Sequence, residues 1–333
     1  MVEQSFTTLD KREASEDDEL RVFAEEILVG LAGHPKRLPS RYFYDDEGSR
    51  LFQKICTLEE YYPTRIERGI LEQSAAEILA PLGEAPVNVI DLGAGDGHKT
   101  APLLAHLLER GVPVRYVPID ISEGALAESI RVIGGRFPEL EIRGLAAEYF
   151  DGLAWLAGQT SRRNLVLFLG SNIGNFDKPR ALAFLRRLWN ALNPDDRVLI
   201  GFDLKKDIEV LLSAYGDPHG VTARFNLNLL ERINRELGAN FDVGRFRHFG
   251  TYNVFSGAME SYLVSLEQQT VRIEALSWEA KFAPWEPIHT EYSYKYLERD
   301  IDALAEASSF SIEHRALDEA RWFCDALWRV SKR

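Results

Sequence analysis

The chain has 333 residues, 45% of them hydrophobic, so it can form a substantial core and is long enough for two modest domains. Its net charge of −13, with no cluster of Lys and Arg, argues against nucleic acid as a partner. Two cysteines cannot form a disulfide framework, and no signal peptide or long apolar run is present. We therefore expect a soluble, cytoplasmic monomer without membrane association, and the scattered histidines predict no metal site.

The N-terminal third combines polar, helical and aromatic segments. Residues 1–18 are polar and end in an acidic run, which predicts a disordered or frayed tail. Apolar residues recur at helical spacing over Leu20–Leu31, and a further helix is predicted over Thr64–Leu79. The intervening Leu38–Arg65 is dense in aromatic residues, most of which we expect to pack as a cap over the neighbouring domain.

Strands and helices then alternate, and five such units in sequence predict an α/β fold with a Rossmann-like parallel sheet. In this architecture, ligands bind beyond the carboxyl ends of the strands. The predicted strands are Val87–Ile90, Val114–Ile119, Glu141–Ala146, Asn164–Phe168 and Arg197–Phe202, and the predicted helices are Lys99–Arg110, Ser122–Gly134 and Arg180–Leu192.

The first strand leads into a glycine-rich turn with Gly93, Gly95 and Gly97, followed by Lys99. Glycine permits positive φ and lets a ligand approach bare main chain, although many such turns hold no ligand. The next strand ends in Asp120, which is placed to accept hydrogen bonds from ribose hydroxyls. This combination resembles the S-adenosylmethionine-dependent methyltransferases, which implies S-adenosylmethionine as the cofactor.

The alternation stops after the fifth strand and returns near the C-terminus. A helical stretch interrupted by DPHG is followed by antiparallel strands, which predicts an inserted α+β region. A helix over Leu297–Ala307 and a hairpin of Ser311–Ala316 with Trp322–Val330 would then complete the sheet. We predict a substrate-binding domain of residues 19–63 and 205–294, and an S-adenosylmethionine-binding domain of residues 64–204 and 295–333.

Four separated motifs make the resemblance more specific: YYPTR at Tyr61–Arg65, FLGSNIGNF at Phe168–Phe176, AYGDPHGVTARFNLN at Ala214–Asn228 and HTEYS at His289–Ser293. In this order they resemble the histidine-specific methyltransferases of ergothioneine biosynthesis, and the similarity runs from about Leu38 to the end of the chain. The resemblance implies an N-methyltransferase that acts on the α-amine of L-histidine, up to the trimethylated betaine.

The resemblance also implies which residues form the site. Lys99 would lie near the cofactor carboxylate and Asp120 at the ribose. Methyl transfer from a sulfonium depends mainly on positioning, so no covalent nucleophile is expected. The implied cofactor-binding residues are Gly93, Gly95, Lys99, Asp120, Gly170 and, at the adenine, Glu148 and Tyr149. The implied substrate-positioning residues are Asn175 and Tyr215 at the amino and carboxylate groups, Tyr61, Glu291 and Ser293 at the imidazole, and Tyr44 near the amine.

Several of these residues have structural alternatives. Glu291 would make a charge-assisted hydrogen bond to a ring N–H, or would pair with Lys295 if a helix begins there. Asn175 would otherwise cap a loop, and Tyr44 is expected mainly to pack.

Three features depart from the family pattern and affect recognition of the ring rather than methyl transfer. They are Glu148-Tyr149 in place of Asp-Phe, Ser261 in place of a bulkier apolar residue, and the additional Tyr292, Tyr294 and Tyr296. The alternatives are therefore an ovothiol-type enzyme that methylates an imidazole nitrogen of histidine or thiohistidine, or an enzyme for another aromatic amino acid. A non-catalytic, cofactor-binding regulatory protein is the alternative from a different class.

Overall fold

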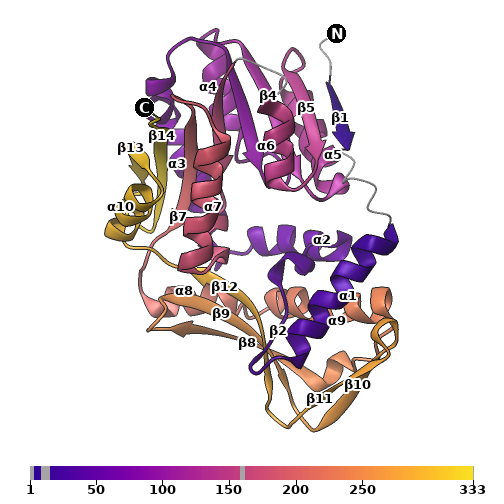
Figure 1. Cartoon of the computed structure of the whole chain (residues 1–333). Coiled ribbons are helices and arrows are strands. Elements are labelled where there is room, and N and C mark those ends of the chain that lie inside the picture. The colour runs from indigo at the N-terminus through magenta and orange to yellow at the C-terminus, as the bar shows by residue number, and fades with distance from the viewer. Residues whose placement is uncertain (1–3, 9–15, 158–161, 333) are drawn as a thin grey trace. The chain divides into compact units, whose positions relative to one another are not determined.

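The structure is a computed structural model that describes residues 4–8, 16–157 and 162–332. The chain divides into two compact units (Figure 1). Unit 1 contains Met1–Leu9, Pro63–Lys205 and Lys295–Arg333, and unit 2 contains Asp10–Tyr62 and Lys206–Tyr294. Which ligand each unit binds stays a prediction. Within the described ranges, we find no helix with the length and apolar character that crossing a membrane requires.

Unit 1 is built on a sheet of eight strands among the described residues, in the order β1-β5-β4-β3-β6-β7-β14-β13. Neighbours from β1 through β7 are parallel, whereas β14 is antiparallel to both β7 and β13. The predicted parallel sheet with a terminal antiparallel hairpin is therefore confirmed. The strands are β1 (Gln4–Thr8), β3 (Val87–Leu92), β4 (Val114–Asp120), β5 (Glu141–Ala146), β6 (Arg163–Phe168), β7 (Arg197–Asp203), β13 (Phe310–Leu317) and β14 (Phe323–Val330).

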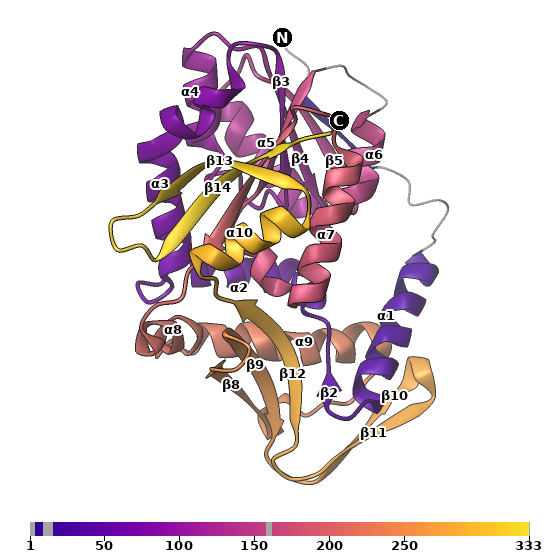
Figure 2. The ribbon, with the colours of Figure 1, turned by 60° about the vertical axis from the view of Figure 1, so that its left-hand side comes forward.

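Helices flank both faces of this sheet (Figures 1 and 2). Those on one face, α3, α4 and α5, share a buried core with the strands, to which they contribute Leu71, Leu104 and Ile133. On the other face α6 contacts α7, as right-handed crossovers from β5 to β6 and from β6 to β7 require. Among the helices that the described residues of unit 1 form, α6 alone has no counterpart in the sequence prediction. The helices are α3 (Tyr62–Leu79), α4 (Ala101–Glu109), α5 (Glu123–Arg136), α6 (Tyr149–Ala157), α7 (Lys178–Ala191) and α10 (Glu298–Ala307).

The N-terminal segment differs from the frayed tail predicted over residues 1–18. Gln4–Thr8 forms β1, which pairs in parallel with β5, and α1 already begins at Glu16. Without β1, the strand β5 would be the edge of the sheet and would leave a row of backbone N–H and C=O groups unpaired. Pairing of these groups is independent of side-chain type, which explains why a polar segment forms a strand here. Residues 1–3 and 9–15 of the predicted tail lie outside the described residues.

Unit 2 contains a four-stranded sheet, β2-β12-β9-β8, and a two-stranded ribbon, β10-β11. Buried residues of α9, such as Phe225, Leu229 and Ile233, share a core with α1, α2 and the strands. The predicted break at DPHG separates α8 from α9, and there Asp217 accepts hydrogen bonds from the backbone of Val221 and Thr222. The elements are α1 (Glu16–Ala32), β2 (Lys36–Arg37), α2 (Asp46–Cys56), α8 (Ile208–Tyr215), α9 (Val221–Leu237), β8 (Phe246–Asn253), β9 (Ala258–Ser265), β10 (Gln269–Ile273), β11 (Trp278–Phe282) and β12 (Pro287–Tyr294).

Candidate functional site

Four predicted cofactor-binding residues lie at the carboxyl ends of adjacent strands in unit 1. Gly93 follows β3, Asp120 ends β4, Glu148 follows β5 and Gly170 follows β6. These strands are neighbours in the order β5-β4-β3-β6, and neighbouring strands lie about 4.8 Å apart. The sheet therefore brings the four positions to one edge.

The glycines of these turns adopt a left-handed backbone conformation in which a side chain would be strained, and they leave bare main chain. Gly93 and Gly170 have φ of 73° and 75°, in the left-handed region that favours glycine. A Cβ atom on Gly93 would lie 2.9 Å from the hydroxyl of Tyr149, and one on Gly170 would lie 2.8 Å from Lys99 Nζ. Gly95 has φ of 55° and faces open space. A ligand can therefore approach the backbone closely at this edge.

Lys99 and Asp120 place opposite charges around the glycine turn. Lys99 precedes α4 and so lies outside the first helical turn to which the sequence assigns it, and its ammonium pairs with Glu67 at 3.0 Å. Asp120 accepts a hydrogen bond from Ser122 N at 2.9 Å. Burial raises the pKa of Asp120, and backbone N–H groups, including that of Gly95, oppose the shift. Asp120 offers a carboxylate to ribose hydroxyls, and Lys99 offers a cation to the carboxylate of the amino-acid end. Both fit the cofactor that the resemblance implies.

Of the predicted adenine-flanking pair, Glu148 directly precedes α6 and Tyr149 is its first residue. Glu148 is exposed, whereas the Tyr149 ring contacts the rings of Phe168 and Phe184, with centroids 6.0 and 6.4 Å away. Burial raises the pKa of Tyr149, and the negative charge of Asp120 raises it further. The Tyr149 hydroxyl therefore stays protonated, next to the Gly93 turn.

Asp91, in β3, is a buried carboxyl beneath the glycine turn and accepts hydrogen bonds from Thr100 and, at 3.0 Å, from the Tyr116 hydroxyl. Burial raises its pKa to about 6, although both hydrogen bonds oppose the shift. Between about pH 4 and 6 the native state thus binds more protons at Asp91 than the unfolded chain does, so the contribution of Asp91 to the free energy of unfolding falls by about 3 kcal/mol as pH rises through this window. Asp91→Asn should remove this dependence in urea unfolding curves. Identical pH dependence in both proteins would contradict the assignment.

Five of the six predicted substrate-positioning residues lie on unit 2. The Tyr215 hydroxyl donates to Ser293 Oγ at 2.7 Å, and the Tyr61 and Tyr215 rings lie 6.2 Å apart. Burial raises the pKa of Tyr61 well above its ordinary value, and electrostatic coupling to Tyr215, Tyr44 and Glu291 adds to this shift. The five residues therefore form one polar and aromatic group, drawn from segments far apart in sequence.

The local structure around Glu291, Asn175 and Tyr44 bears on the structural alternatives for these residues. Glu291 lies in β12, a strand, so the helical pairing with Lys295 is wrong; Lys295 instead pairs with Asp203 at 2.8 Å. In a strand, residues four apart are separated by about 13 Å. Asn175 lies on unit 1, in the 3₁₀ turn η3 (Asn172–Asn175) that follows β6. Tyr44 has packing contacts with Phe52 and other rings, as expected.

The sequence interpretation missed Glu67 and Asp91, two buried acids beside the predicted cofactor residues. Glu67 occupies the same helical stripe as buried Ile70 and Leu71 of α3, and Asp91 lies in β3, whose other residues are apolar except for Asn88. A carboxylate at a core position is a signal in itself, because a buried charge needs compensating partners.

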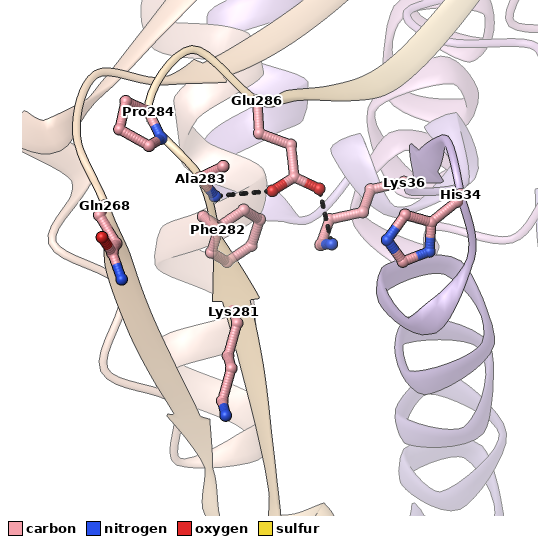
Figure 3. A pocket seen from close by; sticks show the side chains of 8 residues that line it. All are labelled: His34, Lys36, Gln268, Lys281, Phe282, Ala283, Pro284 and Glu286. Atoms are coloured by element: carbon pink, nitrogen blue, oxygen red, sulfur yellow. Dashed lines mark hydrogen bonds and ion pairs between the residues drawn. The ribbon is translucent and has the colours of Figure 1, made fainter.

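A cavity of about 380 Å³ on unit 2 contains none of the predicted site residues (Figure 3). Its most buried charged group is Lys36, which pairs with Glu286 at 2.7 Å. The other oxygen of Glu286 accepts from Ala283 N at 2.8 Å, closing the turn between β11 and β12. These contacts account for Lys36 and Glu286 structurally.

Comparisons with known proteins agree with the motifs. The model of a family described as histidine-specific, SAM-dependent methyltransferases matches residues 23–330. A histidine N-alpha-methyltransferase of Mycolicibacterium smegmatis is 37% identical over 310 residues, which cover 93% of each chain. One of Mycobacterium tuberculosis is 36% identical over 300 residues, which cover 90% of each chain. Ergothioneine biosynthesis protein 1 of Schizosaccharomyces pombe is 30% identical over 286 residues, which cover 83% of this chain and 36% of that protein.

Proposed function

Because the chain belongs to the histidine-specific, S-adenosylmethionine-dependent methyltransferases, we propose that it methylates the α-amine of L-histidine, up to the trimethylated betaine. The observation that carries the proposal is the similarity to two histidine N-alpha-methyltransferases along nine tenths or more of both chains. The grouping of Tyr61, Tyr215, Glu291 and Ser293 on unit 2 supports it, because these residues offer hydrogen-bonding partners for a small polar ring.

The proposed roles follow from what the chemistry requires. S-adenosylmethionine, when bound, supplies an electrophilic methyl group, and its adenosine and amino-acid ends would be held by Asp120 and Lys99. The attacking amine must be unprotonated, and a carboxylate beside it would favour the charged form. We therefore place Glu291 at the imidazole, where its charge accepts a ring N–H without stabilising the ammonium. Asn175 and Tyr215 would hold the amino and carboxylate groups.

The product identifies the methylated nitrogen. With histidine and isotope-labelled S-adenosylmethionine, tandem mass spectrometry should find the labelled methyl groups only on the fragment that carries the α-amine. A second incubation with α-N,N-dimethylhistidine should yield the trimethylated betaine, because the same nitrogen accepts each methyl group. Label on an imidazole fragment would indicate ring methylation instead. Turnover of tryptophan, tyrosine or thiohistidine but not of histidine would assign a different substrate, and cofactor binding without any turnover would indicate a regulatory protein.

A further inference from the structure

Three ionisable side chains meet inside unit 1, next to the turn that carries Gly170. Glu67 comes from α3, Asp325 from β14 and Lys99 from the loop after β3. Glu67 and Asp325 have 0% of their surface exposed. Neither acid belongs to the loops at the carboxyl edge of the sheet. Glu67 hydrogen-bonds to Lys99 and Gly170 from α3, whereas Asp325 lies opposite Gly201 on β14.

Glu67 connects two of those loops through its two oxygens. Its Oε1 accepts a hydrogen bond from Gly170 N at 2.6 Å, and its Oε2 accepts one from Lys99 Nζ at 3.0 Å. Lys99 follows β3 and Gly170 follows β6, and these strands are direct neighbours. Hydrogen bonds to an ionised acceptor are about twice as strong as neutral ones, so one carboxylate fixes the separation of both loops.

The sheet leaves room for this carboxylate by carrying a glycine. A Cβ atom on Gly201, in β7, would lie 2.3 Å from Glu67 Oε1 and 3.1 Å from the ring of Phe323. Any side chain at position 201 would therefore displace the Glu67 carboxylate. Asp325 is the residue directly opposite Gly201 in the pairing of β7 with β14.

Asp325 differs from Glu67 in its bonding. Within the described part of the chain, neither of its carboxyl oxygens has a hydrogen-bond partner. Burial raises the pKa of Asp325 well above its ordinary value, the charge of Glu67 raises it further, and Lys99 opposes the shift. Glu67, and not Asp325, hydrogen-bonds to the Lys99 ammonium, so Glu67 is the counter-charge in direct contact with Lys99.

We propose that Glu67 is a positioning residue for the amino-acid end of S-adenosylmethionine, because it holds the Lys99 ammonium and the Gly170 N–H in one arrangement. The inference rests on the role proposed for Lys99 at the cofactor carboxylate, and is independent of which histidine nitrogen is methylated. A lysine side chain has a flexible four-carbon stem, and binding a ligand with it ordinarily costs conformational freedom. Here Glu67 restricts Lys99 before the ligand arrives.

Two ligands separate this role from a general effect on the fold. S-adenosylhomocysteine carries the amino-acid end, whereas 5′-methylthioadenosine keeps the adenosine and lacks that end. In isothermal titration calorimetry, Glu67→Gln should weaken S-adenosylhomocysteine binding about 10- to 100-fold and leave 5′-methylthioadenosine binding unchanged. Gly201→Ala, which keeps the charge but displaces the carboxylate, should produce the same split. Asp325→Asn, a neutral change at an equally buried position, should match the wild type with both ligands.

The outcomes are distinguishable. The inference would be overturned if Glu67→Gln and Gly201→Ala weakened the binding of both ligands equally, or the binding of neither. This conclusion requires that Lys99→Ala still weakens the binding of S-adenosylhomocysteine alone. If Lys99→Ala also fails to separate the ligands, the proposed cofactor role of Lys99 is wrong, and the inference falls with it. If the Glu67→Gln protein does not fold, Gly201→Ala provides the test, because this variant retains the Glu67 carboxylate.

Discussion

Replacing Glu291 with alanine should weaken histidine binding strongly while leaving the affinity for S-adenosylmethionine nearly unchanged. Loss of a charged partner from a hydrogen bond costs about 1.5–3 kcal/mol, so the KM for histidine should rise about 10- to 100-fold. Initial rates at saturating cofactor give this KM, and calorimetry with S-adenosylhomocysteine gives the cofactor affinity.

The surroundings of Glu291 explain why its effect should be confined to the substrate. It lies on β12 opposite Ser261 of β9, whose hydroxyl donates to Glu291 Oε2 at 3.5 Å, the long limit of a hydrogen bond. Its charge also acts on Tyr61, which places it with the tyrosines of unit 2. All the proposed cofactor-binding residues belong to unit 1.

Glu260 provides the matched control. It neighbours Ser261 on β9, so its side chain points to the opposite face of the same sheet. There it is buried and accepts hydrogen bonds from Tyr262 and, at 3.0 Å, from Asn253 Nδ2. Glu260→Ala should therefore reduce stability and leave the histidine KM unchanged. If Glu291→Ala lowered histidine and cofactor affinity together, or if both variants behaved alike, Glu291 would be structural.

The sequence predicted unit 1 well because its strands are marked by local patterns. In β3 all six residues are buried, and its flanks are a charged loop and a glycine turn, so both the type and the end of the element are visible. The predicted helix likewise begins at Ser122, which caps α5, its hydroxyl accepting from Ala125 N at 3.2 Å. The positions after these strands follow from topology alone, because parallel strands end at the same edge.

Contacts that depend on tertiary structure could not be predicted from the sequence. The pairing of β1 with β5 depends on an open sheet edge, which no pattern in a polar tail reveals. Neither α2 nor α6 was predicted: α2 lies in the aromatic-rich segment that was interpreted as a cap, and α6 begins at Tyr149, which was interpreted as part of an adenine-binding pair. The bond between Tyr215 and Ser293 joins residues 78 positions apart, and only the family resemblance grouped them.

Asp120 should have the largest effect on the cofactor. Asp120→Ala removes the carboxylate proposed to accept both ribose hydroxyls, and two hydrogen bonds to a charged acceptor predict a loss of affinity of about 100-fold or more. Asp120→Asn should lie between this variant and the wild type, because the amide keeps one acceptor oxygen and loses the charge. Binding of both S-adenosylhomocysteine and 5′-methylthioadenosine should weaken, since both contain the ribose. The effect on both ligands distinguishes Asp120 from Lys99 and Glu67, because substitutions of those two residues should weaken the binding of S-adenosylhomocysteine only.

Glu141 is the control for this experiment, because it begins β5 at the opposite end of the same sheet and pairs with Arg115 at 2.8 Å. Glu141→Ala should leave both affinities unchanged. Asp120 also accepts from Ser122 N, so a folding defect must be separated from a binding defect. The thermal midpoint without ligand reports the first, and the increase in that midpoint with saturating S-adenosylhomocysteine reports the second. An Asp120→Ala protein that keeps the full ligand-induced increase would show that the ribose is held elsewhere, and the proposed cofactor site at the carboxyl ends of β3 and β4 would be wrong.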